Sequence, residues 1–188
     1  MRQACEASWQ PGLRLGRIYK GTSKDLDFGP SSPDRNHRDR QAFENFKEKG
    51  TLALKTCVKY AEEKKVLLLL EPINRYETNV INTLAEGSDL IREIESQHLK
   101  LIPDTFHMNI EERSLEESIV DAGAYIGYIH FADSNRLSPG WGHIDFFKIV
   151  SALKKTNYIG AVGIEVLPQP DDYSAAEQAI RYLNSMNI

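Results

Sequence analysis

The chain of 188 residues carries 23 lysine and arginine residues against 27 aspartate and glutamate residues, which leaves a formal net charge of −4. Its length and its hydrophobic content of 41% suffice to bury the core of a single globular domain. The acidic balance argues against a nucleic-acid partner, and the longest apolar run, 66–70, is far shorter than the roughly 20 residues that span a bilayer, which argues against a membrane partner. Because the two cysteines make no disulfide framework, we expect a cytoplasmic protein.

The first part of the chain differs in composition from the rest. The stretch GLRLGRI at 12–18 is compatible with one strand, whereas 20–40 is polar, charged and rich in glycine, proline and serine, as surface loops are. We therefore divide the chain into an irregular N-terminal segment, 1–40, with one candidate strand, and a single folded unit, 41–188, that no linker interrupts.

From residue 39 onward, patterns of helices and strands alternate. Apolar residues at helical spacing predict a first helix, and VLLLL at 66–70 predicts a buried strand. Thr83 and Glu86 have the spacing of a capping box and open a second helix, before a strand within LKLIPD at 99–104. The residues expected on the inner face of the first helix are Phe43, Phe46, Leu54, Cys57, Val58 and Ala61.

The same alternation continues to the end of the chain. Ser114 and Glu117 repeat the capping-box spacing before a short helix, and YIGYIHF at 125–131 predicts a third strand. Asp145 begins a helix over 145–156, YIGAVGIEV at 158–166 predicts a fourth strand, and a last helix runs from about 173 to 186. Strands that are apolar on both faces and alternate with helices indicate βα units around a parallel sheet.

Four predicted strands end in a side chain that can bind a metal, about one βα repeat apart in each case. In a parallel barrel all carboxyl ends of strands face one rim, so these side chains would converge there. Oxygen ligands with one nitrogen suit Mn²⁺, Mg²⁺ or Co²⁺. A single carboxylate at a strand end is more often a helix cap or a solvated loop residue, so the spacing alone leaves both interpretations open. The four residues are Glu71, Asp104, His130 and Glu165.

Four motifs resemble those of a known enzyme family. LEPINRYETNVINT at 70–83, DTFHMNIEE at 104–112, IHFADSNRLSPGWG at 129–142 and GAVGIEV at 160–166 occur in the order found in ketose 3-epimerases of the D-tagatose 3-epimerase type. That family lies within the xylose-isomerase-like superfamily of (β/α)8 TIM barrels. The resemblance extends from about residue 55 to residue 186.

The resemblance implies a centre that binds one divalent metal ion, most commonly Mn²⁺, with Mg²⁺ or Co²⁺ as alternatives. Its ligands would be Glu71, Asp104, His130 and Glu165, and the two glutamates would also serve as the catalytic acid and base. Glu77, His107 and Arg136 would contact the substrate. From the residues alone, Glu77 could equally be a loop carboxylate near Arg75, and Arg136 could pair with Asp133 in a surface loop.

The implied activity is metal-dependent 3-epimerisation of a small ketose, an isomerase reaction of carbohydrate metabolism. Loss of the C3 proton beside the C2 carbonyl gives an enediolate, which the metal would stabilise. Epimerisation needs proton return on the opposite face, and hence two bases. The alternatives are hydroxypyruvate isomerase or another aldose–ketose isomerase of the superfamily, and an inactive, truncated relative. The net charge disfavours an apurinic-site endonuclease.

The length does not suffice for a whole barrel, because (β/α)8 barrels typically need about 250 residues and at least about 200. The four metal-ligand strands would be strands 5 to 8, and GLRLGRI would be strand 4, so we expect an incomplete barrel without strands 1 to 3. Such a chain could be a fragment, complete itself as a homo-oligomer, or be a reduced relative; a fragment is favoured. An incomplete barrel leaves open strand edges and an uncovered core.

Overall fold

The computed structural model describes residues 14–15, 40–78 and 80–186, with side chains from residue 47 onward. Most of the predicted N-terminal segment 1–40 therefore lies outside the described residues, as do the side chains of Phe43 and Phe46. Of the segment's candidate strand, two residues form β1 (Arg14–Leu15).

Five short parallel strands form the centre of the fold. They are β1, β2 (Leu68–Leu70), β3 (Leu99–Leu101), β4 (Ile129–Phe131) and β5 (Ala161–Ile164). β2 pairs with β3, and β4 pairs with β5, in parallel register. Bridges from Leu101 to Ile126 and from Asp104 to His130 join β3 to the β4 segment, so the strand order is β2, β3, β4, β5, β1. The predicted parallel sheet is confirmed, and it is open within the described residues.

The position of β1 differs from the expectation. As a fourth barrel strand it would pair with β2, but Arg14 and Leu15 instead pair with Ala161 and Val162 of β5. β1 therefore occupies the place that a first strand takes beside the eighth in a closed barrel. A two-residue ladder is too short for its side-chain pattern to specify a partner, so the sequence could not predict this pairing.

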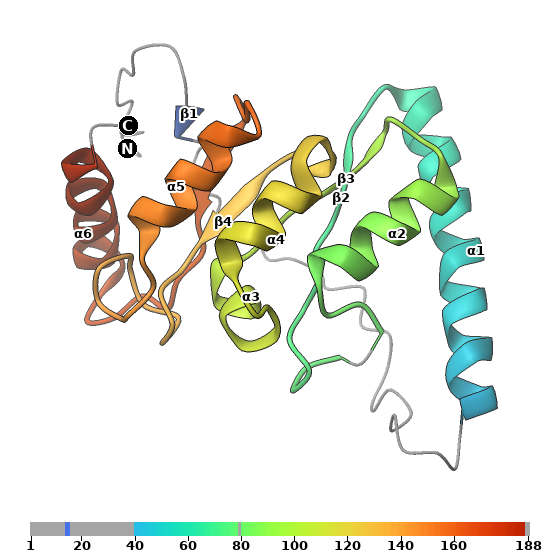
Figure 1. The fold of residues 1–188 in the computed structure, drawn as a ribbon, viewed down its shortest axis with the longest axis horizontal. Coiled ribbons are helices and arrows are strands. Elements are labelled where there is room, and N and C mark those ends of the chain that lie inside the picture. The colour runs from blue at the N-terminus through green and yellow to red at the C-terminus, as the bar shows by residue number, and fades with distance from the viewer. Residues whose placement is uncertain (1–13, 16–39, 79, 187–188) are drawn as a thin grey trace.

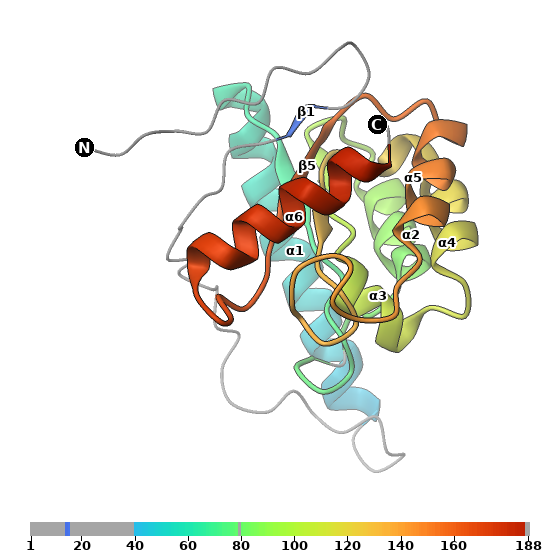
Figure 2. The same ribbon diagram turned by 90° about the vertical axis from the view of Figure 1, so that its left-hand side faces the viewer.

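The helices lie in chain order along the sheet. They are α1 (Arg40–Lys64), α2 (Leu84–Ile94), α3 (Thr105–Glu111), α4 (Leu115–Ala122), α5 (Phe146–Lys155) and α6 (Asp172–Ser185), with a 3₁₀ turn, η1 (Gly123–Tyr125), after α4. Figure 1 shows α6 and α1 at the two ends of this row, with α5, α4 and α2 between them. Seen from the α6 end, α2, α4 and α5 lie on one side of the strands (Figure 2). None of these described helices combines the length and apolarity needed to cross a membrane.

Side-chain caps explain where the helices begin. Thr83 accepts a hydrogen bond from the backbone N–H of Glu86, whose carboxylate accepts in return from Thr83, so the predicted capping box is confirmed. Ser114 and Asp145 likewise cap α4 and α5. The seven-residue α3 was not predicted; it begins directly after Asp104, whose carboxylate caps it.

The core lies between the sheet and the helices. Leu101, Ile129 and Phe131 are fully buried and belong to one cluster with Phe146 and Leu153 of α5. Burial of such large side chains contributes about 1.5–3 kcal/mol each and holds the strand ends at fixed positions. Of the predicted inner face of α1, Val58 and Ala61 are buried and Leu54 is partly buried, whereas Cys57 is exposed, contrary to the expectation.

The opposite face of β2 is exposed, although the sequence predicted burial on both faces. Leu68 and Leu70 pack against the core, and Leu67 and Leu69 on the other face are 47% and 39% exposed. These two side chains lie beside Gly127, where an added Cβ would stand 3.0 Å from Leu69 and 3.2 Å from Leu67. Among the described residues β2 has one strand partner, β3, so its other edge is unpaired.

Candidate metal centre

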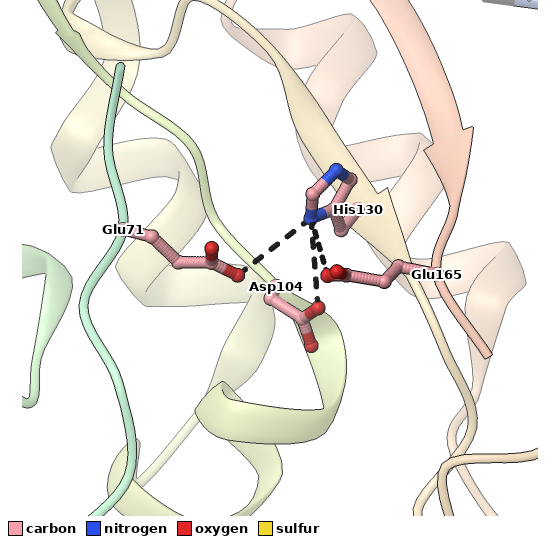
Figure 3. Close-up of side chains that lie close together, drawn as sticks. All are labelled: Glu71, Asp104, His130 and Glu165. Atoms are coloured by element: carbon pink, nitrogen blue, oxygen red, sulfur yellow. Dashed lines mark ion pairs between the residues drawn. The ribbon is translucent and has the colours of Figure 1, made fainter. Parts of the chain in front are cut away.

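The carboxyl ends of four adjacent strands bring four polar side chains together. Glu71, Asp104 and Glu165 follow β2, β3 and β5, and His130 lies within β4. Each offers one candidate ligand atom, and all four atoms lie within 4.8 Å of one another. Figure 3 shows Glu71 and Glu165 reaching toward each other from opposite sides, with His130 and Asp104 between them. The structure thus brings together the four residues that the sequence singled out as metal ligands.

The ring of His130 is at the centre of this group. Its Nδ1 atom lies 2.8 Å from Glu165 Oε2, 3.6 Å from Glu71 Oε1 and 3.8 Å from Asp104 Oδ2. His130 Nδ1, Glu71 Oε1 and Asp104 Oδ2 are buried and form no hydrogen bond of acceptable geometry. Buried polar atoms without partners are costly, and three of them facing one point are what a bound cation would satisfy. Three carboxylates and one imidazole also fit a hard divalent ion.

The charges of the group are strongly coupled. Burial raises the pKa of Asp104 to about 7, although the guanidinium of Arg136 opposes this shift. Burial lowers the pKa of His130, but Glu165 and Glu71 outweigh it and raise the pKa to about 9. The His130 ring in turn holds the pKa of Glu165 at about 2. Without a cation, a proton on His130 therefore offsets the carboxylate charge at neutral pH.

The two carboxylate oxygens of Asp104 have different roles: one caps α3, and the other faces the candidate metal centre. Oδ1 accepts hydrogen bonds from the backbone N–H groups of Phe106 and His107 at the start of α3. Oδ2 remains without a hydrogen-bond partner and faces His130. The two interpretations of a carboxylate at this strand end, helix cap and metal ligand, are therefore compatible, since each uses a different oxygen.

Arg136 crosses the edge of the same group. Its Nη1 donates to Asp104 Oδ1 at 2.8 Å, its Nη2 donates to Glu165 Oε2 at 2.9 Å, and its guanidinium stands over the ring of Phe106. The alternative pairing with the Asp133 carboxylate is wrong. That carboxylate is fully buried and accepts backbone N–H groups of its own loop, those of Ser134, Gly140 and Ile144.

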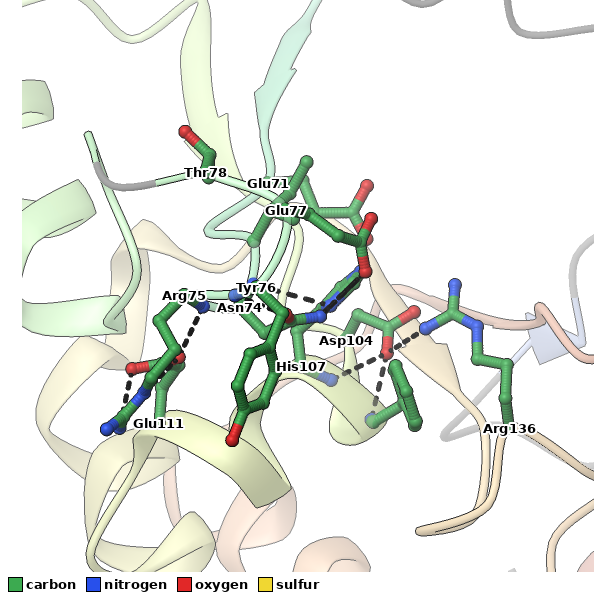
Figure 4. Close-up of polar contacts among 12 residues, drawn as sticks. Glu71, Asn74, Arg75, Tyr76, Glu77, Thr78, Asp104, His107, Glu111 and Arg136 are labelled. Carbon is green, nitrogen blue, oxygen red and sulfur yellow. Dashed lines mark hydrogen bonds and ion pairs between the residues drawn. The ribbon is translucent and has the colours of Figure 1, made fainter. Parts of the chain in front are cut away.

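The turn after β2 carries Glu77 to the buried ring of His107, as Figure 4 shows. Arg75 binds Glu111 with both its guanidinium and its backbone N–H. Glu77 instead accepts a hydrogen bond from Asn74, which also contacts His107. Burial lowers the pKa of His107, so this ring favours the neutral form.

Sequence reasoning missed Asn74 as a member of this group. Its side chain is 2% exposed, and its Oδ1 accepts the backbone N–H of Tyr76 two residues later. An asparagine in a polar stretch directly after a strand is a known signal for such an Asx turn, and it could have been found in the sequence.

Comparisons with known proteins show which family the chain resembles. A family model described as "Xylose isomerase-like TIM barrel" matches residues 28–186. A D-psicose 3-epimerase of Enterocloster bolteae is 44% identical over 112 residues, which are 60% of this chain and 37% of that protein. A 3-dehydro-D-guloside 4-epimerase of Escherichia coli is 36% identical over 124 residues, which are 66% of this chain and 47% of that protein.

A solved structure is similar over more of the chain. The D-psicose 3-epimerase from Clostridium cellulolyticum H10, determined with D-tagatose, has a TM-score of 0.73 and 28% sequence identity. The match covers 84% of this chain and 58% of that one. The chain thus spans less than half the length of the two curated relatives above and somewhat more than half of this solved structure.

Proposed function

Because the chain belongs to the xylose isomerase-like TIM-barrel family, we propose that it is a cytoplasmic, divalent-metal-dependent ketose 3-epimerase acting on a small ketose. One observation carries the proposal: four side chains from adjacent strand ends converge within 4.8 Å, and three of them present buried atoms without hydrogen bonds. The 3-epimerases among the similar proteins support the choice of reaction.

Glu71, Asp104, His130 and Glu165 would hold the metal ion, with Mn²⁺ as the first choice and Mg²⁺ or Co²⁺ as alternatives. When bound, a divalent ion supplies Lewis-acid stabilisation for negative charge that develops on substrate oxygens.

Glu71 and Glu165 are suited to proton transfer, because they approach the centre from opposite sides (Figure 3). One carboxylate would take the proton from C3 while the C3–H electrons move toward the C2 carbonyl, which gives an enediolate. The other would return a proton to C3 on the opposite face and so restore the carbonyl. A single base would return the proton to the face from which it came, so two flanking carboxylates favour epimerisation.

Three further side chains would bind and orient the ketose. Arg136, held between Asp104 and Glu165, places a positive charge beside the centre. His107 can donate a hydrogen bond to a substrate oxygen, and Glu77, whose side chain is 57% exposed, can accept one from a substrate hydroxyl. Together they would align C3 with the two carboxylates, and such alignment is a large part of catalysis.

Exchange of substrate hydrogen in ²H₂O tests the proposal. With Mn²⁺ and a panel of ketoses, we expect deuterium at C3 and formation of the C3 epimer, both read by NMR. Glu165→Gln should remove both, whereas Glu177→Gln, on the exposed face of α6, should not. Exchange confined to C1 or C2 would favour an aldose–ketose isomerase. No exchange from a folded, metal-loaded protein would favour the inactive relative.

We also propose that self-association covers the exposed side of β2. Leu67 and Leu69 are more exposed than leucines of a closed hydrophobic core are, and β2 has no second strand partner within the described residues. An unpaired strand edge beside exposed leucines is a template for pairing with another chain. The expected product is a homo-oligomer in which copies of this chain shield one another's β2.

A further inference from the structure

The side chain of Asn74 connects two of the proposed substrate-binding residues. Its Nδ2 atom lies 2.7 Å from Glu77 Oε1 and 2.8 Å from His107 Nδ1. Glu77 Oε1 itself is 3.9 Å from His107 Nδ1, which is too far for a hydrogen bond. The amide group of Asn74 therefore bridges an acceptor and a ring that do not bind each other directly (Figure 4).

The orientation of this amide is fixed by its other end. The backbone N–H of Tyr76 can only donate, and it lies 3.0 Å from Asn74 Oδ1. The carbonyl oxygen of the side chain must therefore face Tyr76, and the NH₂ group must face Glu77 and His107. Both amide hydrogens are then used, one for each partner.

The ring of His107 thus faces two donors at one nitrogen. Besides the side-chain NH₂ group, the backbone N–H of Asn74 donates to Nδ1 at 3.4 Å. An imidazole nitrogen that accepts cannot carry a proton, so the proton of the neutral ring must be on Nε2. Nδ1 is occupied by this contact, and Nε2–H is the group that remains to donate.

We propose that Asn74 is a positioning residue that fixes His107 as its Nε2–H tautomer and holds Glu77 at a set distance from it. The role in orienting substrate rests on the proposed function, because it requires that His107 and Glu77 bind the ketose. A donor at Nε2–H and an acceptor at Glu77 would then recognise a carbonyl and a hydroxyl of the same ligand. The tautomer itself does not depend on that function.

Other contacts hold the shape of the turn, which allows the role of Asn74 to be separated from folding. Arg75 binds Glu111 through its backbone N–H and its guanidinium. Asn82, 3% exposed, donates from Nδ2 to the backbone carbonyls of Ile73 and Thr78. Asn82 is thus a second buried asparagine of the same turn, but its side chain binds only backbone carbonyls in these contacts. A substitution of Asn82 is therefore the matched control for a substitution of Asn74.

Long-range ¹H–¹⁵N NMR of the full chain with ¹⁵N-labelled histidine tests the tautomer without metal or substrate. His107→Gln identifies the ring signals by their loss. At a pH where the ring is neutral, we expect the Nε2–H pattern in the wild type. Asn74→Asp should move a proton to Nδ1, because a carboxylate there accepts instead of donating. Asn82→Asp should keep the Nε2–H pattern.

Three results would overturn the inference: a proton on Nδ1 in the wild type, an unchanged ring in Asn74→Asp, or the same change in Asn82→Asp. Kinetics then tests the substrate role, where Asn74→Asp should raise KM for the ketose about tenfold and leave kcat nearly unchanged, as loss of one aligned hydrogen bond implies. A shifted tautomer with an unchanged KM would refute that role. Absence of turnover in the wild type would instead contradict the proposed function, and the NMR result would still decide the tautomer.

Discussion

Arg136 donates a hydrogen bond of 2.8 Å to Asp104, a side chain that is completely buried. The same guanidinium also reaches Glu165, so one cation neutralises part of the charge of two carboxylates from different strand ends. This arrangement allows Asp104 to be buried while its other oxygen remains directed at His130.

The first prediction concerns this arginine. Arg136→Gln should lower the free energy of unfolding of the metal-free protein by about 2 kcal/mol, because it removes the guanidinium that neutralises part of the charge of the buried Asp104 carboxylate. Urea denaturation followed by circular dichroism measures the change. Arg181→Gln, which breaks an exposed pair with Glu177, should have a much smaller effect. Equal effects of the two substitutions would show that the Asp104 contact does not stabilise the fold.

The second prediction concerns proton release on metal binding. With a pKa of about 9, His130 carries a proton at pH 7, and ligation requires that the proton leave. Asp104, with a pKa of about 7, is about half protonated at the same pH. Calorimetric titration with Mn²⁺ in buffers of different ionisation enthalpy should therefore report release of between one and two protons at pH 7, and affinity should rise between pH 6 and pH 9. His143→Asn, at an exposed ring outside the centre, should not alter this. Heats that are independent of the buffer would contradict the prediction.

The third prediction concerns stability and pH without metal. A raised pKa means that the folded state holds the proton more tightly, so its contribution is present at low pH and is lost as pH rises. For His130 the loss occurs from about 6.5 to about 9, and for Asp104 from about 3.8 to about 7. Glu165, with its lowered pKa, acts oppositely and loses its contribution as pH falls from about 4.5 to about 2.

The metal-free protein should therefore become less stable to urea between pH 6.5 and pH 9, and saturating Mn²⁺ should remove this trend. His130→Asn should flatten the curve of the metal-free protein over that interval. If the variant and the wild type lose stability in parallel, the trend has its origin outside the centre.

The fourth prediction separates two glutamates of one motif. Glu71→Gln should weaken Mn²⁺ binding at least about tenfold, because it removes one charged oxygen from the cluster of candidate ligands. Glu77→Gln should leave Mn²⁺ binding intact, since its carboxylate contacts Asn74 and lies outside the cluster of candidate ligands. Calorimetric titration with Mn²⁺ measures both effects. Loss of Mn²⁺ binding in Glu77→Gln would refute this assignment.

The fifth prediction concerns the exposed side of β2. Leu69→Lys should shift the chain toward monomer in analytical ultracentrifugation, because a charge on an exposed strand opposes pairing with another chain. Val120→Lys is the matched control, since Val120 on α4 is 42% exposed and Leu69 is 39% exposed. An unchanged mass in Leu69→Lys would place the contact between copies elsewhere.

The sequence predicted those parts of the fold that local chemistry determines. Thr83, Ser114 and Asp145 cap helices because a side-chain oxygen and a backbone N–H lie three residues apart, a relation visible in sequence. The convergence of Glu71 and Glu165 followed from parallel strands sharing one rim. The pairing of β1 with β5 depends on contacts between distant segments, and no local pattern encodes it.

Other features were not predicted because they depend on short elements or on contacts between residues far apart in the sequence. α3 has seven residues, which is too short for a clear helical pattern of apolar residues, so the possible cap at Asp104 did not lead to the prediction of a helix. Cys57 lies at helical spacing with buried residues but just beyond the covered stripe of α1. The bridge formed by Asn74 required the ring of His107, 33 residues later, to be located first.

Because the sheet is open within the described residues, an ion bound by the four converging side chains would also affect the shape of the sheet. A closed barrel fixes the distance between strand ends by its complete ring of ladders, whereas here β2 is held by β3 alone within the described residues. An ion bound by both Glu71 and Glu165 would connect the end of β2 to the end of β5, the first and last of these four adjacent strands. Its binding energy would then set the curvature of the sheet, and the spacing of the two carboxylates would depend on the ion they hold.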